Sequence, residues 1–177
     1  MTTLPTTTAP PSPHPVPFTE RQLRDALGQF ATGVTIVTTA DAQGQPVGMT
    51  VSSFSSVSLA PPLVLWCLGR ATALRPVFER SQHYAIHVLA LDQLDLALRF
   101  SSKMSDRFDH VAWQPNAQGV PILDGAAAVF ECVLRNRYDG GDHMIMLGQV
   151  LQCRHQPAAP LLYHSGHLGL QLAATTA

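Results

Sequence analysis

The sequence predicts a mainly β fold with peripheral helices, arranged as a small and largely antiparallel barrel. Short segments rich in β-branched residues recur along the chain and outnumber the segments with helical periodicity. Most of these segments are joined by short turns, whereas a parallel doubly wound sheet needs a helix between nearly all of its strands. There is no G-x-G-x-x-G motif after a strand and no P-loop, so any nucleotide is held without those devices.

The composition excludes several classes of protein. At 177 residues the chain is long enough for one domain with a substantial core, and its net charge of −1 provides no basic surface for nucleic acid or an anionic membrane. No apolar segment approaches the roughly 20 residues of a membrane span. The N-terminus lacks the pattern of a secretory signal. We therefore expect a cytoplasmic protein that binds neither nucleic acid nor membrane.

The cysteines and histidines do not form a metal-ligand pattern. Three cysteines (Cys67, Cys132 and Cys153) are odd in number and lie far apart in apolar surroundings, which predicts buried thiols rather than disulfides. His83 and His87 would lie roughly 13 Å apart along a strand. His164 and His167 would lie on opposite faces of one. No cysteine or carboxylate joins either pair at ligand spacing, so we expect no metal.

The domain boundaries follow from composition. Residues 1–17 are rich in Thr and Pro and carry too little apolar surface to offset the entropy of ordering, which predicts a disordered leader. The folded domain is expected over residues 18–172, with a short tail at 173–177.

The first element of that domain is predicted to be a helix over residues 20–30. Thr19 and Gln22 have the spacing of a capping box, and Phe18 and Leu23 that of a hydrophobic staple. Its apolar residues recur on one face, which indicates an amphipathic helix; they are Leu23, Ala26, Leu27 and Phe30. We expect Gly33 to end it.

The next segments predict β-strands. Val34–Thr39 is almost entirely β-branched, and the turn-rich residues 41–46 lead into a second strand over Val47–Ser53, so a hairpin is expected. The apolar run from Leu63 to Leu68, bounded by prolines and a glycine, predicts a strand buried on both faces.

The remaining elements are predicted from similar signals. Two short helices are expected, one capped by Thr72 with Pro76 in its first turn and one capped by Asp92. Residues 112–127 look irregular. Further strands are expected over 84–90, 128–138, 143–155 and, as a final addition, 161–170.

A hydroxyl-rich segment lies between the hairpin and the apolar strand. Six hydroxyl residues beside a buried strand need partners; they are Thr50, Ser52, Ser53, Ser55, Ser56 and Ser58. These side chains either bond one another and the nearby backbone, or they face a polar ligand that approaches the chain closely. The chemistry of the segment leaves both interpretations open.

His143 is a second candidate site residue. It follows Gly140, Gly141 and Asp142 and opens a predicted strand, so its ring can reach a cleft while its backbone stays in the sheet. The alternative is a turn histidine bonded to a carbonyl. A hydrolytic triad is not favoured, because no serine sits in a G-x-S-x-G elbow.

Taken in order, these stretches resemble the flavin reductase-like family, which includes the small reductase components of two-component flavin monooxygenases. The similarity extends from about residue 20 to residue 170. The segments that carry it are 30–38, 48–59, 61–64, 84–89, 99–100, 106–108, 141–148 and 160–163.

The resemblance implies a split β-barrel of the FMN-binding type and a homodimer. It also implies reduction of FMN or FAD by NADH or NADPH. In such proteins the segment corresponding to Thr50, Val51, Ser52 and Ser53 lies against the isoalloxazine ring, and the loop from Arg70 to Thr72 holds phosphate. Arg99 is a further phosphate or ribityl candidate. His143 corresponds to a histidine near the nicotinamide, and Tyr163 to a residue that lines the same cleft.

Several positions depart from the family pattern. His87 stands where the family often has Asn, Ala60 where it has Asp, and Gln149 where it has Glu. A hydroxyl common in the phosphate loop is replaced by Leu74, which leaves the grip on phosphate and the choice between FMN and FAD open. His87 either compensates or packs in the core.

The leading hypothesis is therefore an NAD(P)H:flavin oxidoreductase that passes reduced flavin to a separate monooxygenase. Hydride transfer between nicotinamide and flavin is chemistry of the cofactors, which explains why the chain shows many hydroxyls and no acid–base pair. The alternatives are a flavin- or haem-binding split-barrel module without reductase activity, and an oxidase that keeps flavin as a prosthetic group.

Overall fold

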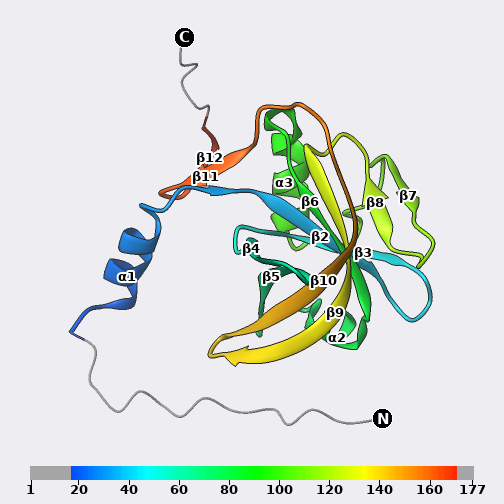
Figure 1. Cartoon of the computed structure of the whole chain (residues 1–177). Coiled ribbons are helices and arrows are strands. Elements are labelled where there is room, and N and C mark those ends of the chain that lie inside the picture. The colour runs from blue at the N-terminus through cyan, green and yellow to red at the C-terminus, as the bar shows by residue number, and fades with distance from the viewer. Residues whose placement is uncertain (1–16, 171–177) are drawn as a thin grey trace.

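The computed structural model describes residues 17–170 and confirms a mainly β domain (Figure 1). Its largest sheet has seven strands in the order β3-β2-β6-β9-β10-β5-β4, and every pairing is antiparallel. The end strands β3 and β4 do not pair with each other, so the barrel is split, as predicted. The strands are β2 (Thr35–Ala40), β3 (Pro46–Val51), β4 (Ser55–Leu59), β5 (Pro62–Gly69), β6 (His83–Val88), β9 (Ala128–Gly140) and β10 (His143–His155).

Two smaller sheets were predicted only in part. The final strand expected over 161–170 is a hairpin of β11 (Leu162–His164) and β12 (His167–Leu170), and β11 also pairs with β1 (Thr32–Gly33). The segment expected to be irregular contains the hairpin β7 (Trp113–Pro115) and β8 (Pro121–Leu123). The strand β4 was also not foreseen, because its serines carry no strand signal.

Within one chain, β5 buries only one of its two faces, so the prediction that both faces are buried is wrong. Val64, Trp66 and Leu68 enter the core. There Trp66 meets Phe78 and Tyr84 edge-to-face, with ring centroids 5.2 and 5.8 Å away. The other face of β5 is half-buried. A second core cluster, built around Ile36, Leu89 and Phe100, lies under the helix that follows β6.

His87 packs in this core and does not reach a ligand. Its ring is fully buried; Nδ1–H donates to the carbonyl of Ile36 at 3.1 Å, and Nε2 accepts from the backbone N–H of Leu123 at 3.0 Å. The histidine therefore ties β6 to β2 and β8. Burial lowers the pKa of His87 from 6.5 to about 4, and the charge of Arg154 acts in the same direction.

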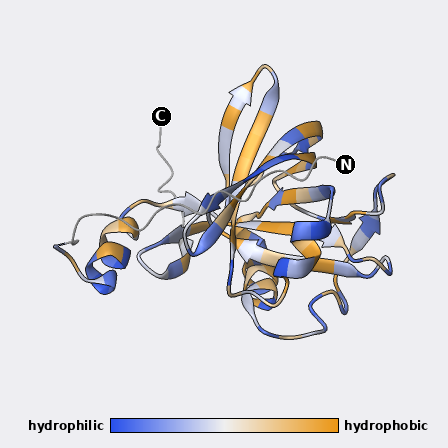
Figure 2. Cartoon of the chain, turned by 90° about the horizontal axis from the view of Figure 1, so that it is seen from below, coloured by the Kyte–Doolittle hydropathy of each residue, from blue (hydrophilic) through white to orange (hydrophobic). Residues whose placement is uncertain are grey.

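The helix α1 (Glu20–Leu27) has the predicted capping box between Thr19 and Gln22. It ends at Gly28 rather than at Gly33, because the chain turns there toward β1. None of its residues is buried, and it stands apart from the barrel in Figures 1 and 2. The predicted apolar stripe is therefore exposed, up to 77% at Phe30, which follows the helix.

The other helices begin differently from the prediction. Helix α2 (Arg75–Arg80) has Leu74 at its N-cap, and Thr72 instead accepts a bond from the Leu74 N–H at 3.3 Å. Pro76 lies in the first turn, as expected. Asp92 lies inside the 3₁₀ turn η1 (Leu91–Gln93) and does not cap α3 (Leu94–Ser101).

The cysteines are free, as predicted, but less buried than predicted. All three cysteines are free, but only Cys132 is buried, since Cys67 is half-buried and Cys153 is exposed. Burial raises the pKa of the Cys132 thiol to about 12.

Among the described helices, none is long and apolar enough to cross a membrane. The predicted leader, apart from Pro17, and the predicted tail lie outside the described residues.

The buried His87 predicts a pH-dependent stability. Because its folded pKa lies below the unfolded value, its contribution is complete above about pH 6.5 and is lost as the pH falls toward 4. The free energy of unfolding should fall by about 3 kcal/mol over that range from this group. Denaturant unfolding at several pH values measures it.

His87→Asn should flatten this part of the pH profile. The exposed residue His155 provides a matched control, and His155→Gln should keep the wild-type slope. An unchanged slope in His87→Asn would show that the neutral His87 ring is not its source.

Candidate functional site

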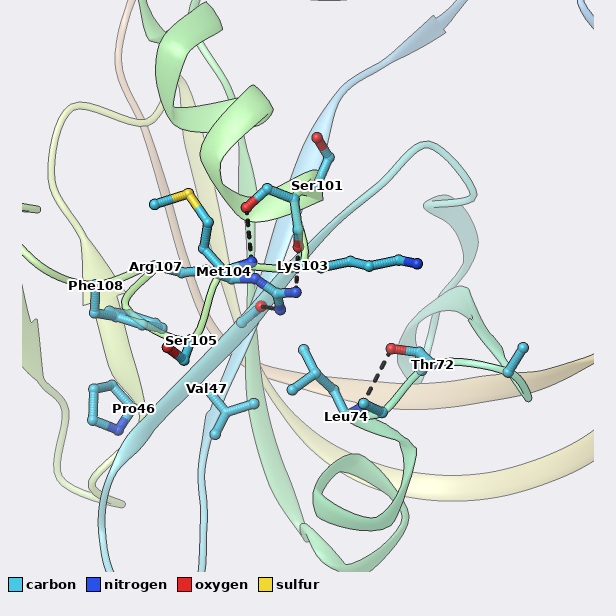
Figure 3. A pocket seen from close by; sticks show the side chains of 14 residues that line it. Pro46, Val47, Thr72, Leu74, Ser101, Lys103, Met104, Ser105, Arg107 and Phe108 are labelled. Atoms are coloured by element: carbon cyan, nitrogen blue, oxygen red, sulfur yellow. Dashed lines mark hydrogen bonds between the residues drawn. The ribbon is translucent and has the colours of Figure 1, made fainter.

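A cleft of about 640 Å³ lies where three segments far apart in sequence meet (Figure 3). These are the start of β3, the loop between β5 and α2, and the segment after α3. Its lining residues are Pro46, Val47, Gly48, Ala71, Thr72, Ala73, Leu74, Ser101, Ser102, Lys103, Met104, Ser105, Arg107 and Phe108.

Gly48 allows the cleft to form. A Cβ built on Gly48 would lie 2.7 Å from Cε1 of Phe100 and 3.3 Å from Cζ of Phe108. The two rings pack edge-to-face with centroids 4.9 Å apart, and Phe100 is buried. The absence of a side chain at Gly48 therefore lets the segment after α3 lie directly on β3.

The polar lining combines hydroxyls with two cations. Arg107 is committed to the protein, since it donates to the carbonyl of Gly48 at 3.0 Å and to that of Ser102. Lys103 is exposed and forms no salt bridge within residues 17–170. Its side chain extends across the view of Figure 3 toward the segment that carries Thr72. This combination of ammonium and hydroxyl groups fits an anionic group such as phosphate.

The segment 50–53 lies just beyond this lining. The Thr50 hydroxyl donates to the carbonyl of Ala97 at 2.7 Å, and Ser53 Oγ accepts from the backbone N–H of Cys67 at 2.9 Å. Val51 is buried, whereas Ser52 is exposed. The hydroxyls of Thr50 and Ser53 thus bond the backbone, one of the two alternatives for this segment, and hold it rigidly between α3 and β5.

His143 lies at the start of β10, opposite Gly69 of β5. Its side chain is 49% exposed, and Nδ1 lies 2.7 Å from Oδ1 of Asp142. The bond from His143 lowers the pKa of the Asp142 carboxyl. A Cβ on Gly69 would lie 3.6 Å from Nε2 of His143, so the ring covers this glycine. His143 is therefore placed beside the strand that leads into Ala71 and Thr72, but it does not itself line the cleft.

Arg70 faces the hairpin of His143. Its Nε donates to the carbonyl of Gly141 at 2.8 Å, and one terminal nitrogen lies 3.2 Å from Oδ2 of Asp139. Of the two residues predicted to hold phosphate in this loop, the structure places Thr72 in the cleft lining and engages Arg70 elsewhere.

Two predicted site residues are not brought to the cleft within one chain. Arg99 holds the loop after α3 by donating to the carbonyls of Asp106 and Asp109, at 3.1 and 2.8 Å. It lines a separate cavity of about 300 Å³. Tyr163, in β11, lines a pocket beside α1.

Sequence reasoning missed the cationic part of the site. Lys103 and Arg107 follow α3 in a polar segment, Ser101 to Arg107, whose position after an apolar helix is the only local signal. What makes them site residues is contact with segments more than 25 positions away, which no local pattern reveals.

Comparison with known protein families assigns this chain to one of them. A family model described as a flavin reductase like domain matches residues 27–169. The chain belongs to this family.

Named relatives agree with this assignment. The chain is 46% identical over 149 residues to the FMN reductase (NADH) SmoA of Agrobacterium fabrum, covering 84% of each chain. It is 38% identical over 160 residues to HsaB, a flavin-dependent monooxygenase reductase subunit of Mycobacterium tuberculosis, covering 88% of this chain and 85% of the relative. Some relatives are longer, and the chain covers 43% of a probable flavin reductase of Rhizobium meliloti.

Solved structures share the fold. The NADH:FAD oxidoreductase SgcE6 of Streptomyces globisporus, solved with NAD and FAD fragments, has a TM-score of 0.83 at 37% identity. The match covers 89% of this chain and 96% of that one. Component B of nitrilotriacetate monooxygenase from Mycobacterium thermoresistibile has a TM-score of 0.80 at 37% identity, covering 84% of each chain.

The close approach at Gly48 predicts that Gly48→Ala is destabilising. The added methyl group must displace the buried Phe100, so we expect the free energy of unfolding to fall by about 1–3 kcal/mol. Thermal and denaturant unfolding measure the effect. A Cβ on Gly33 meets nothing within 4 Å, so Gly33→Ala is the control and should leave stability almost unchanged. Equal stability of the two variants would contradict the packing described for Gly48.

Proposed function

We infer that this chain is an NAD(P)H-dependent flavin reductase that supplies reduced FMN or FAD to a partner monooxygenase. The observation that carries the inference is a cleft with hydroxyl and ammonium groups, next to the hairpin of His143, in a split barrel of the flavin reductase-like family. The reductases of monooxygenase systems among the relatives support the transfer of flavin to a partner.

The residues divide into a phosphate-binding group and a ring-binding group. Lys103, Thr72 and the serines after α3 would hold the phosphate of FMN or FAD, since they line the cleft with donors. The backbone and hydroxyls of Thr50–Ser53 would bind the polar edge of the isoalloxazine ring. Their bonds to Ala97 and Cys67 keep that segment rigid, and a preorganised site reorganises less during the reaction.

His143 would bind the nicotinamide, oriented by Asp142. When bound, the cofactors supply a hydride transfer from nicotinamide C4 to flavin N5. The chain then has to hold the two rings in contact and to stabilise the negative charge that reaches the flavin. Asp142 accepts from Nδ1–H of His143, which leaves Nε2 as the ring atom directed toward Gly69 and the adjoining loop.

We propose that two copies of the chain associate. Helix α1 buries none of its own residues, so its apolar stripe needs a surface that residues 17–170 of one chain do not provide. The outer face of β5 and β10 is also apolar and half-buried, through Leu63, Leu65, Cys67, Ile145 and Leu147. A second copy would cover both surfaces.

The three free thiols support the proposed location in the reducing cytoplasm.

Steady-state oxidation of NADH and NADPH by the purified protein, with and without FMN or FAD, tests the function. We expect activity that saturates with free flavin. His143→Ala should lower kcat/KM for the nicotinamide by about tenfold and leave the flavin Kd almost unchanged. The control His155→Gln lies at the far end of β10 and should behave as wild type. Folded protein without activity would favour a flavin- or haem-binding module, and tightly retained flavin an oxidase.

Lys103 predicts a difference between FMN and riboflavin, which lacks the phosphate. Lys103→Met should weaken FMN binding by about tenfold and leave riboflavin binding unchanged, because the ammonium group pairs with phosphate alone. Fluorescence titration measures both affinities. Arg80→Met removes the same charge from an exposed site outside the cleft and serves as the control.

Lys103 is the only lysine in the sequence, so acylation of amines by a mild reagent, read by mass spectrometry, reports on it directly. FMN should protect it and riboflavin should not. Equal protection by both flavins would place Lys103 away from the phosphate.

A further inference from the structure

Arg70 joins the end of β5 to the tip of the β9–β10 hairpin through three bonds. Its backbone N–H donates to the carbonyl of Asp142 at 2.9 Å. Its side-chain Nε donates to the carbonyl of Gly141 at 2.8 Å, and a terminal nitrogen pairs with Oδ2 of Asp139 at 3.2 Å. Arg70, the first residue after β5, thus contacts three of the four residues that precede His143.

The hairpin tip is built to receive this side chain. Oδ1 of Asp139 accepts from the N–H of Gly141 at 2.9 Å, while Oδ2 pairs with Arg70. Gly141 has φ +77°, a conformation that favours glycine, and this conformation turns its carbonyl toward the guanidinium. The Asp139 side chain is 10% exposed and that of Arg70 is 27% exposed, so water screens the pair only in part.

The same tip determines where His143 lies. His143 directly follows the hairpin residues that Arg70 bonds, and it pairs with Gly69, the neighbour of Arg70. Its ring lies over Gly69, whose missing side chain leaves 3.6 Å between the Cβ position and Nε2. On the other side, Arg70 precedes Ala71 and Thr72 of the cleft lining. Any shift of the hairpin relative to β5 therefore moves His143 relative to the cleft.

We propose that Arg70 is a positioning residue, which locks the hairpin of His143 against the cleft loop, and that it does not bind flavin phosphate. The proposal rests on the function proposed above for His143. Nε and one terminal nitrogen of Arg70 are bonded to the hairpin, so a two-nitrogen grip on phosphate would break the ion pair with the largely buried Asp139 carboxylate, which is costly. Lys103, which forms no salt bridge within residues 17–170, already provides a cation at the cleft.

Kinetics with two flavin substrates separate the two roles of Arg70. Arg70→Met should lower kcat/KM for the nicotinamide by about tenfold, and by the same factor with riboflavin as with FMN. The Kd of FMN should stay close to that of the wild type. A loss confined to FMN, or a weaker FMN Kd with unchanged riboflavin kinetics, would identify Arg70 as a phosphate ligand and overturn the proposal.

A double-mutant cycle with His143→Ala tests whether Arg70 acts through the histidine. In the His143→Ala background, Arg70→Met should cause little further loss, because the group that it positions is absent. If the losses in kcat/KM from the two substitutions were fully additive, Arg70 would not act through His143, and the proposal would be overturned. If His143→Ala itself has no effect, the role proposed for His143 fails. This outcome is distinct from one in which His143→Ala lowers kcat/KM but Arg70→Met adds its loss independently.

Two further variants keep the test open if Arg70→Met does not fold. Asp139→Asn removes the charge of the partner, and Arg70→Lys keeps the charge but loses the fork that bonds Asp139 and Gly141 together. Both should reproduce the flavin-independent loss in smaller measure while thermal unfolding shows folded protein. Wild-type kcat/KM in both variants would also overturn the proposal.

Discussion

The antiparallel pairing of β10 with β5 is the constraint on which the candidate site depends. Its register sets His143 opposite Gly69 and Gln149 opposite Leu63, so the start of β10 meets the end of β5. The end of β5 then continues into Ala71 and Thr72 of the cleft. A shift of one residue would move the core side chain Trp66 of β5 or Met146 of β10 to the outer face, and the cost of exposing it holds the register. The same core that stabilises the fold thereby fixes the position of the site.

The site consists mainly of groups that hold rather than react. Thr50 and Ser53 bond the backbone of α3 and β5, Arg107 bonds that of β3, and Arg70 bonds the hairpin tip. Such bonds make the segments around the cleft rigid before any ligand arrives. A reaction whose chemistry resides in two cofactors requires this rigidity more than it requires an acid or a base.

Two apolar surfaces, on β4 and on α1, remain exposed within residues 17–170. Leu59, at the end of the terminal strand β4, is 96% exposed, and the stripe of α1 has no cover among residues 17–170. These surfaces lie on elements that the main core does not use. The proposed association of two copies would bury them without altering the packing of the barrel.

Local elements of this protein follow from the sequence, because neighbouring residues determine them. The capping box of α1, the β-branched strand β2 and the glycine-rich turn before β10 each depend on contacts within a few positions, and the order of the motifs indicated the family and the split barrel. The sequence could not show that α1 is exposed, that β5 buries one face, or that Lys103 joins Thr72 in one cleft. It also could not show that His87 is a core residue and Arg70 a partner of Asp139. These features arise from pairings between segments 25 to 100 residues apart, whose partners are selected by the packing of the whole chain.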